Sequence, residues 1–221
     1  MGFSEKLIVW YKQNERDLPW RKTTDPYKIW LSEIILQQTR VAQGLNYYNK
    51  FLNKHPTIQS LAESSEKNIL NLWQGLGYYS RARNLHFTAK YISKELNGKF
   101  PTKYQDILNL KGVGEYTAAA IASFSYQEVY PVIDGNVYRV LSRIFGVESA
   151  IDSTSGKKIF KKLATELIDN KNPDTYNQAI MEFGALQCKP KNPNCEDCPF
   201  LLECFAYKNK QITELPKKDK K

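Results

Sequence analysis

Hydrophobic residues recur along this chain at the three- and four-residue spacing of α-helices, and the strict alternation typical of β-strands is rare. A first helix is predicted from Phe3 to near Gln13, and others are predicted from about 65 to 74 and from 80 to 96. We therefore expect an all-α fold. The length of the chain, 221 residues, suits one large domain or two small lobes.

One helix start is marked by two adjacent residues. Asp25 is typical of an N-cap, and Pro26 is typical of the first helical position. The residues that follow place Ile29, Trp30 and Ile34 at core spacing. This pattern predicts a helix with a strongly apolar face.

A glycine-containing turn lies between two short predicted helices within residues 104–124. Thr102-x-x-Gln105 is the pattern of a capping box and predicts the start of the first helix. The turn reads Leu110-Lys-Gly-Val-Gly114, and its glycines let the backbone approach a ligand closely. The N-terminus of the second helix offers N–H groups and a positive dipole end, which suit a phosphate. An ordinary helix–turn–helix corner is the alternative.

The charge of the chain is strongly positive, with 32 Lys and Arg against 23 Asp and Glu and a formal net charge of +9. Such a domain favours a polyanionic partner such as nucleic acid, although a solvated basic surface is also compatible. We expect no membrane segment, since no apolar run approaches the ~18 residues that a spanning helix requires. The charged segment from Leu215 to Lys221 predicts a frayed tail or the beginning of a linker.

The four cysteines form one compact set, C-x6-C-x2-C-x5-C. No apolar leader follows Met1, so we expect a reducing, cytoplasmic setting in which disulfides are disfavoured. Zinc sites of four cysteines usually pair two C-x2-C units, and this chain has one. The short, unequal loops favour a [4Fe–4S] cluster over zinc. The proposed ligands are Cys188, Cys195, Cys198 and Cys204.

Two carboxylates stand in different predicted surroundings. Glu33 lies among apolar residues of its helix, and an apolar setting favours the protonated form of a carboxyl group. Asp134 precedes an apolar helical run, where a helix N-terminus favours the ionised form. One acid and one anion are what cleavage of a glycosidic bond requires. The alternatives are a boundary glutamate that reaches water and a plain N-cap.

Five motifs in order resemble those of a known family, the MutY adenine DNA glycosylases of the endonuclease III superfamily of helix-hairpin-helix enzymes. They are LSEIILQQTRV, WQGLGYYSRARNL, LKGVGEYTAAAIAS, VIDGNVYRVLSR and the cysteine loop, and the resemblance covers roughly residues 3–206.

The resemblance implies a two-lobed, all-α helix-hairpin-helix glycosylase fold. Residues 23–129 would form a six-helix lobe, residues 1–22 with 130–209 a lobe that holds the [4Fe–4S] cluster, and residues 210–221 a charged tail or linker. The implied activity is base excision repair by a monomeric enzyme of the cytoplasm, associated with the bacterial nucleoid. Its partner would be double-stranded DNA that contains adenine mispaired with 8-oxoguanine or guanine, with the adenine flipped out of the stack.

By the same resemblance, Glu33 protonates the adenine and later helps to activate water, and Asp134 stabilises the sugar cation or bonds to it transiently. Tyr116 and Asn136 would support Asp134. The residues implied to bind the substrate are Arg16, Trp20, Arg21, Leu36 and Gln178, with Gln38 and Tyr78 as a wedge in the base stack. Trp20 and Leu36 are equally compatible with the core. The turn residues implied to hold the DNA backbone are Lys111, Gly112, Val113 and Gly114.

One position bears on the reaction subtype. Bifunctional relatives form a Schiff base through a lysine just after the hairpin, where this chain has Tyr116. A phenol cannot form that imine, so we predict a monofunctional glycosylase that leaves an abasic site. Two departures from the family pattern are Lys111, where many relatives carry proline, and the lack of a following Nudix-like domain, which predicts weaker discrimination of 8-oxoguanine from guanine. The rivals are a G·T or G·U mismatch glycosylase of the same superfamily, a lyase, and a non-catalytic DNA-binding module.

Overall fold

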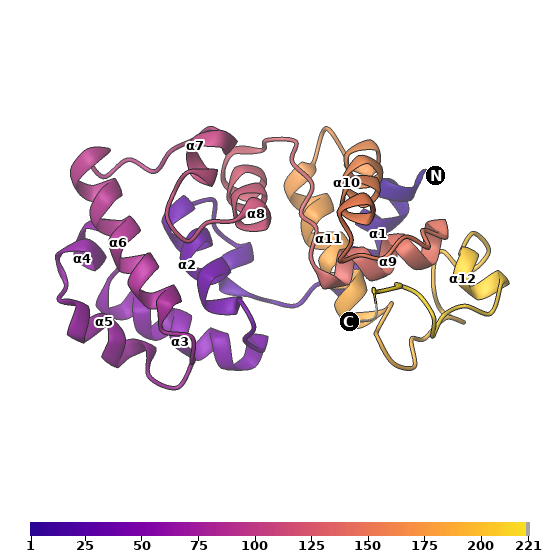
Figure 1. The fold of residues 1–221 in the computed structure, drawn as a ribbon, viewed down its shortest axis with the longest axis horizontal. Coiled ribbons are helices and arrows are strands. Elements are labelled where there is room, and N and C mark those ends of the chain that lie inside the picture. Colours follow the sequence, from indigo (N-terminus) through magenta and orange to yellow (C-terminus); the bar gives the residue numbers. More distant parts are fainter. Residues whose placement is uncertain (220–221) are drawn as a thin grey trace. The chain divides into compact units, whose positions relative to one another are not determined.

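The computed structural model describes residues 1–219, and the regular structure within them is entirely helical, as predicted (Figure 1). None of the described helices is both long and apolar enough to cross a membrane. The elements are α1 (Phe3–Asn14), η1 (Pro19–Arg21), α2 (Pro26–Leu36), α3 (Val41–Lys54), α4 (Ile58–Glu63), α5 (Glu66–Trp73), α6 (Ser80–Glu95), α7 (Tyr104–Leu108), α8 (Glu115–Tyr126), α9 (Gly135–Phe145), α10 (Thr154–Leu167), α11 (Pro173–Leu186) and α12 (Phe205–Lys208).

The chain forms two compact units. Unit 1 consists of Met1–Arg16 together with the chain from Val129 onward, and unit 2 is the continuous segment Asp17–Glu128. Each unit has its own hydrophobic core.

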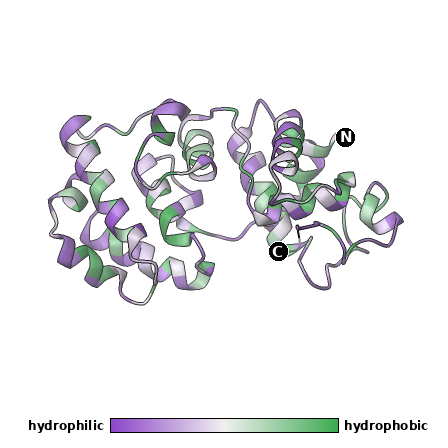
Figure 2. Ribbon diagram, in the orientation of Figure 1, coloured by the Kyte–Doolittle hydropathy of each residue, from purple (hydrophilic) through white to green (hydrophobic). Residues whose placement is uncertain are grey.

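Helix α2 is the central element of unit 2. Eight of its residues, among them Ile29, Trp30 and Ile35, are buried, so the helix is covered nearly all round. The prediction for its start is confirmed: the Asp25 side chain accepts a hydrogen bond from the Tyr27 N–H at 2.9 Å. Helix α8 packs against α2 with an alanine-rich, buried face, and a helix with such small side chains allows close approach (Figure 2).

The predicted capping box before α7 is wrong. Helix α7 starts one residue later, with Lys103 as its N-cap and no side-chain cap hydrogen bond. Gln105 therefore lies at the second helical position, too early for the reciprocal bond that a capping box requires. The buried side chains of Ile107 and Leu110 fix this short segment by packing instead.

Unit 1 joins the two ends of the described chain in one core. Helix α1 lies along α11, where Trp10 meets Phe183 edge to face with ring centroids 4.9 Å apart. Phe3 contacts Phe200 at 5.0 Å. Helix α9 supplies further buried residues to this core and ends at Gly146, which adopts φ 69°.

The prediction of a frayed tail is wrong for the residues up to Asp219. Leu215 is buried, and its carbonyl accepts a hydrogen bond from Arg143 Nε at 3.0 Å. The Ile151 N–H bonds the Lys217 carbonyl at 3.0 Å, and the Asp219 N–H bonds Asp152 at 2.8 Å. A charged sequence of this kind gives no local sign of such partners. Residues 220 and 221 lie outside the described part of the chain.

Candidate functional site

Glu33 lies in the middle of the buried helix α2 and is only 7% exposed. Its neighbours one turn away include Ile29 and Trp30, which are both buried. The alternative of a boundary glutamate that extends into water is therefore wrong. A carboxyl group is rarely kept in such surroundings unless it is paired or has a chemical role.

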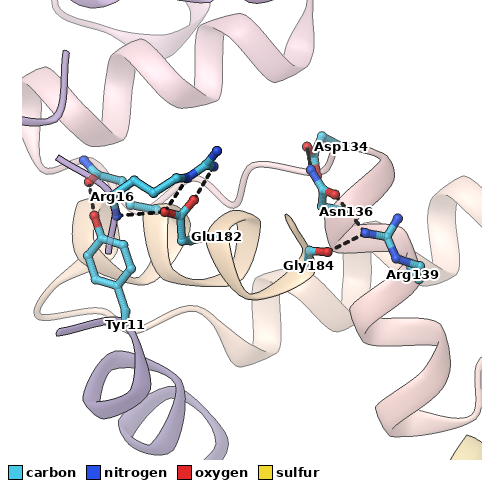
Figure 3. A network of polar contacts seen from close by, with 8 residues as sticks. Tyr11, Arg16, Asp134, Asn136, Arg139, Glu182 and Gly184 are labelled. Carbon is cyan, nitrogen blue, oxygen red and sulfur yellow. Dashed lines mark hydrogen bonds and ion pairs between the residues drawn. The ribbon is translucent and has the colours of Figure 1, made fainter. Parts of the chain in front are cut away.

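Asp134 is the N-cap of α9 and anchors a hydrogen-bond chain (Figure 3). One carboxylate oxygen accepts from the Val137 N–H at 2.8 Å, and the other accepts from Asn136 Nδ2 at 2.8 Å. These two bonds fix the position of the carboxylate at the N-terminus of α9. The N-cap role and the chemical role predicted for Asp134 are thus compatible.

Arg139 continues this chain from Asn136 towards the cysteine loop. Its guanidinium donates to Asn136 Oδ1 at 2.9 Å, to the Gly184 carbonyl at 2.6 Å and to the Cys188 carbonyl at 2.7 Å. Burial lowers the pKa of Arg139. Gly184 gives Asn136 its space, since a methyl group there would lie 2.6 Å from Asn136 Cβ. Arg139 and Gly184 were not predicted from the sequence.

Arg16 is the last residue of the N-terminal segment of unit 1 and forms an ion pair with the buried Glu182 (Figure 3). Glu182 accepts bonds from the Arg16 N–H at 3.0 Å, Nε at 2.9 Å and a terminal nitrogen at 2.6 Å. Gln178, one turn before Glu182 on α11, accepts a bond from the Tyr11 hydroxyl at 2.8 Å. The structure thus brings together two predicted pocket residues, Arg16 and Gln178, around a glutamate that the sequence did not reveal.

The predicted phosphate-binding turn is well defined in unit 2. Gly112 adopts φ 81°, and a methyl group there would lie 2.8 Å from Asn84 Cβ, so glycine is required for both conformation and space. The Thr88 hydroxyl donates to the Lys111 carbonyl at 2.9 Å, and the buried Val113 anchors the turn. Gly114 is the N-cap of α8. The first N–H groups of α8 therefore follow an exposed turn.

The predicted wedge residues share an unusual backbone conformation. Gln38 has φ 54° and Tyr78 has φ 45°, a left-handed region that is unfavourable for both residue types. Both side chains are exposed, Tyr78 to 69%. Backbone strain in exposed residues is often associated with function.

The other predicted pocket residues of unit 2 are half-buried. Trp20 and Arg21 belong to η1, and the Trp20 ring meets Tyr48 edge to face at 5.3 Å. Leu36 ends α2 and faces Gly44, where an added methyl group would lie 2.7 Å from Leu36 Cδ2. Tyr116 is the second residue of α8 and is also half-buried. These contacts explain why Trp20 and Leu36 are partly buried, and part of each side chain stays accessible.

The four cysteines belong to unit 1, where the other three act electrostatically on Cys198, and none is in a disulfide. Burial is the main reason why the pKa values of Cys188 and Cys195 are raised and that of Cys198 reaches about 12, and the neighbouring thiols raise them further. Arg143 reaches into the loop, with a terminal nitrogen 3.6 Å from Cys188 Sγ. Within residues 1–219, no group of three or more His, Cys, Asp or Glu side chains is arranged to hold a single metal ion.

The predicted residues are divided between the two units. Unit 1 holds Arg16, Asp134, Asn136, Gln178 and the four cysteines, and unit 2 holds Trp20, Arg21, Glu33, Leu36, Gln38, Tyr78, Lys111, Gly112, Val113, Gly114 and Tyr116.

Residues 31–168 match the HhH-GPD superfamily of base excision DNA repair proteins. The chain is 45% identical over 223 residues to an adenine DNA glycosylase of Buchnera aphidicola subsp. Schizaphis graminum, a match that covers 99% of this chain and 63% of that protein. It is 41% identical over 223 residues to an adenine DNA glycosylase of Mus musculus, a match that covers 97% of this chain and 43% of that protein. The solved structure of a thermostable thymine-DNA glycosylase matches with a TM-score of 0.87 at 29% identity and covers 94% of this chain and 95% of that one. The chain thus spans about two-fifths to three-fifths of the adenine-enzyme relatives.

Proposed function

The chain belongs to the HhH-GPD superfamily of base excision DNA repair proteins, and from this premise we propose that it is a monofunctional adenine DNA glycosylase. Its similarity to adenine DNA glycosylases extends over nearly the whole chain, at 45% and 41% identity, against 29% for the thymine enzyme. The observation that carries the chemistry is a pair of carboxylates in opposite settings. Glu33 is buried in an apolar helix, while Asp134 accepts two hydrogen bonds at a helix N-terminus.

Hydrolysis of the bond between C1′ of the deoxyribose and N9 of adenine assigns one role to each carboxyl group. Glu33 gives its proton to the imidazole ring of the base, so the bonding electrons leave with a neutral adenine. The ionised Asp134 stabilises the positive charge that develops on the sugar, either through space or by a transient covalent bond. Glu33, now ionised, takes a proton from the water that attacks C1′. The products are adenine and an abasic sugar.

The residue just after the hairpin supports a monofunctional reaction. Tyr116 occupies this position, and its phenol cannot form an imine with the sugar. Borohydride should therefore trap no covalent adduct between the protein and an adenine-containing duplex during turnover. A trapped adduct would support a lyase and contradict this part of the proposal.

The DNA is held, in this proposal, by the turn from Lys111 to Gly114 and the N-terminus of α8, which suit a backbone phosphate without reading sequence. Arg16, Arg21 and Gln178, with the accessible parts of Trp20 and Leu36, receive the flipped adenine, while Gln38 and Tyr78 fill the stack. The proposed substrate is a duplex with adenine opposite 8-oxoguanine or guanine, bound by a monomer.

We further propose that the four cysteines hold a [4Fe–4S] cluster. The thiols are near enough to raise one another's pKa values, and Arg143 brings positive charge beside Cys188, which suits a thiolate set. When bound, the cluster would fix the loop between Cys188 and Cys204 and present Lys189 and Lys191 to the DNA backbone. The purified protein should be brown, with absorbance at roughly 400 nm. A colourless protein with one zinc would contradict the proposal.

A panel of duplexes tests the substrate assignment. Base release is measured for A·8-oxoguanine, A·G, G·T and G·U duplexes under single-turnover conditions. We expect release of adenine from the first two. Loss of thymine from G·T with intact A·8-oxoguanine would instead support the mismatch glycosylase, which the structural similarity to a thymine-DNA glycosylase makes the second candidate.

The acid is tested by Glu33→Gln, with Glu63→Gln as the matched exposed control in the same unit. Removal of a general acid should slow base release by about 10²-fold or more while DNA affinity stays near that of the wild type. The control should behave as wild type. Unchanged turnover in Glu33→Gln would refute its role, and no release by the wild-type protein on any duplex would favour a non-catalytic DNA-binding module.

A further inference from the structure

Arg81, near the start of α6, bonds backbone carbonyls from two separate segments of unit 2. One terminal nitrogen donates to the carbonyls of Ile34 at 3.1 Å, Ile35 at 3.3 Å and Gln37. The other donates to the carbonyls of Leu76 at 3.1 Å and Gly77 at 3.4 Å. The guanidinium therefore joins the C-terminal end of α2 to the turn between α5 and α6.

The setting of this guanidinium is a carbonyl cage rather than an ion pair. Within residues 1–219, Arg81 has no carboxylate partner, and burial lowers its pKa. Its charge lies 5.0 Å from the centre of the Trp73 ring, and the last carbonyls of α2 carry the negative end of the helix dipole. The planar fork of arginine can reach both segments at once, whereas a lysine ammonium is a single point of donation.

Each segment leads directly into a strained residue. Gln37 is followed by Gln38, and Gly77 is followed by Tyr78. Gln38 and Tyr78 both have a positive φ. A left-handed conformation is unfavourable for such residues and persists only where neighbours enforce it. The Gly77 carbonyl also accepts a bond from Trp73 Nε1 at 2.9 Å, so that turn is fixed from two sides.

We propose that Arg81 is a positioning residue that holds Gln38 and Tyr78 as one rigid wedge. The inference rests on the proposed function, in which these two side chains fill the base stack. Arg81 itself does not touch the DNA in this arrangement. It sets the separation of the two turns by bonding the carbonyls that precede the wedge residues.

The test compares Arg81→Lys with Arg83→Lys, which alters an exposed arginine on the same helix that pairs with Glu66 at 3.5 Å. Base release from an A·8-oxoguanine duplex and the fluorescence of 2-aminopurine beside the target adenine are measured. We expect kcat/KM to fall about tenfold in Arg81→Lys, the size of one lost charge-assisted hydrogen bond. The fluorescence rise on binding should shrink as well. Arg83→Lys should match the wild type.

Two further readouts separate positioning from a direct phosphate contact. The slope of log affinity against log salt should be unchanged in Arg81→Lys, since a lost phosphate contact would lower it by about one. The double variant Arg81→Lys/Tyr78→Ala should be no worse than Tyr78→Ala alone, because both changes remove the same wedge. Additive losses, a reduced salt slope or an unaffected Arg81→Lys would each overturn the proposal.

Hydrogen exchange of the wild-type protein provides a test that needs no variant. The Thr39 N–H bonds the Leu36 carbonyl at 3.1 Å, and the Leu76 N–H bonds the Trp73 carbonyl at 3.0 Å, one in each turn. If Arg81 couples the turns, these amides should open with the same free energy. Clearly different values would overturn the coupling. A wild-type protein that releases no adenine would instead refute the proposed function and leave this measurement interpretable.

Discussion

Substitution of Arg16 should destabilise the protein more than substitution of Glu182, its partner in a partly buried ion pair. The Glu182 side chain is 1% exposed, whereas the Arg16 side chain is 37% exposed. Arg16→Met removes two of the three bonds from Arg16 to the carboxylate and leaves the charge in a buried setting, which costs about 3–5 kcal/mol in unfolding free energy. Glu182→Gln leaves an amide that can still accept from the Arg16 N–H, while the guanidinium turns towards water. Its cost should be about 1–2 kcal/mol.

Hydrogen exchange of α11 measures this difference, because that helix reports the stability of unit 1 alone. The control is Lys217→Met, which removes a pair with Glu148 whose side chains are 44% and 49% exposed. Exposed pairs of this kind contribute less than about 1 kcal/mol. The claim that burial determines the cost of each substitution would be refuted if Glu182→Gln destabilised α11 as much as Arg16→Met. An equally large effect of Lys217→Met would refute it too.

Three further outcomes are expected. Gly184→Ala should push Asn136 away from Asp134 and lower the rate of base release with little loss of DNA affinity, and an unchanged single-turnover rate would contradict the close packing there. Gly112→Ala should weaken DNA binding through both strain and crowding, as measured by fluorescence anisotropy, with normal affinity arguing against the phosphate seat. Burial lowers the pKa values of His55 and His86, so the unfolded chain takes up protons first as the pH falls below about 6.5 and stability should drop by up to about 2.7 kcal/mol per pH unit until the native pKa values are passed. Urea titrations between pH 5 and 8 measure this, and a flat profile would contradict it.

Features encoded by adjacent residues were predictable from the sequence. Asp25 before Pro26 specifies a helix start by local hydrogen bonding, and Asp134 caps α9 in the same way. The capping box at Thr102 failed because the packing of Ile107, rather than a local bond, determines where so short a helix begins. Local patterns thus succeed where the stabilising bond itself is local.

Contacts between distant residues were not predictable in this way. Glu182 pairs with a residue 166 positions away, and Arg139 reaches the Cys188 carbonyl 49 positions away. In the sequence, each is one more charged residue on a helix. Arg81 had no signal of its own either, since its partners are main-chain carbonyls, which every residue carries. The Glu33 setting was predictable because its apolar neighbours lie within one helical turn.

Unit 1 is built from two segments that flank unit 2 in the sequence, and this arrangement has a consequence for folding during translation. Unit 2 is continuous, so it can close its core as soon as residue 128 has left the ribosome. Helix α1 is made before unit 2, whereas Phe183 and Phe200, which contact Trp10 and Phe3 of α1, are made after it. During that interval its apolar face has no native partner and is exposed to aggregation or to chaperones. A segment translated before unit 2 can thus take its native place only after unit 2 is complete, so the order of the chain makes the assembly of unit 1 a late step.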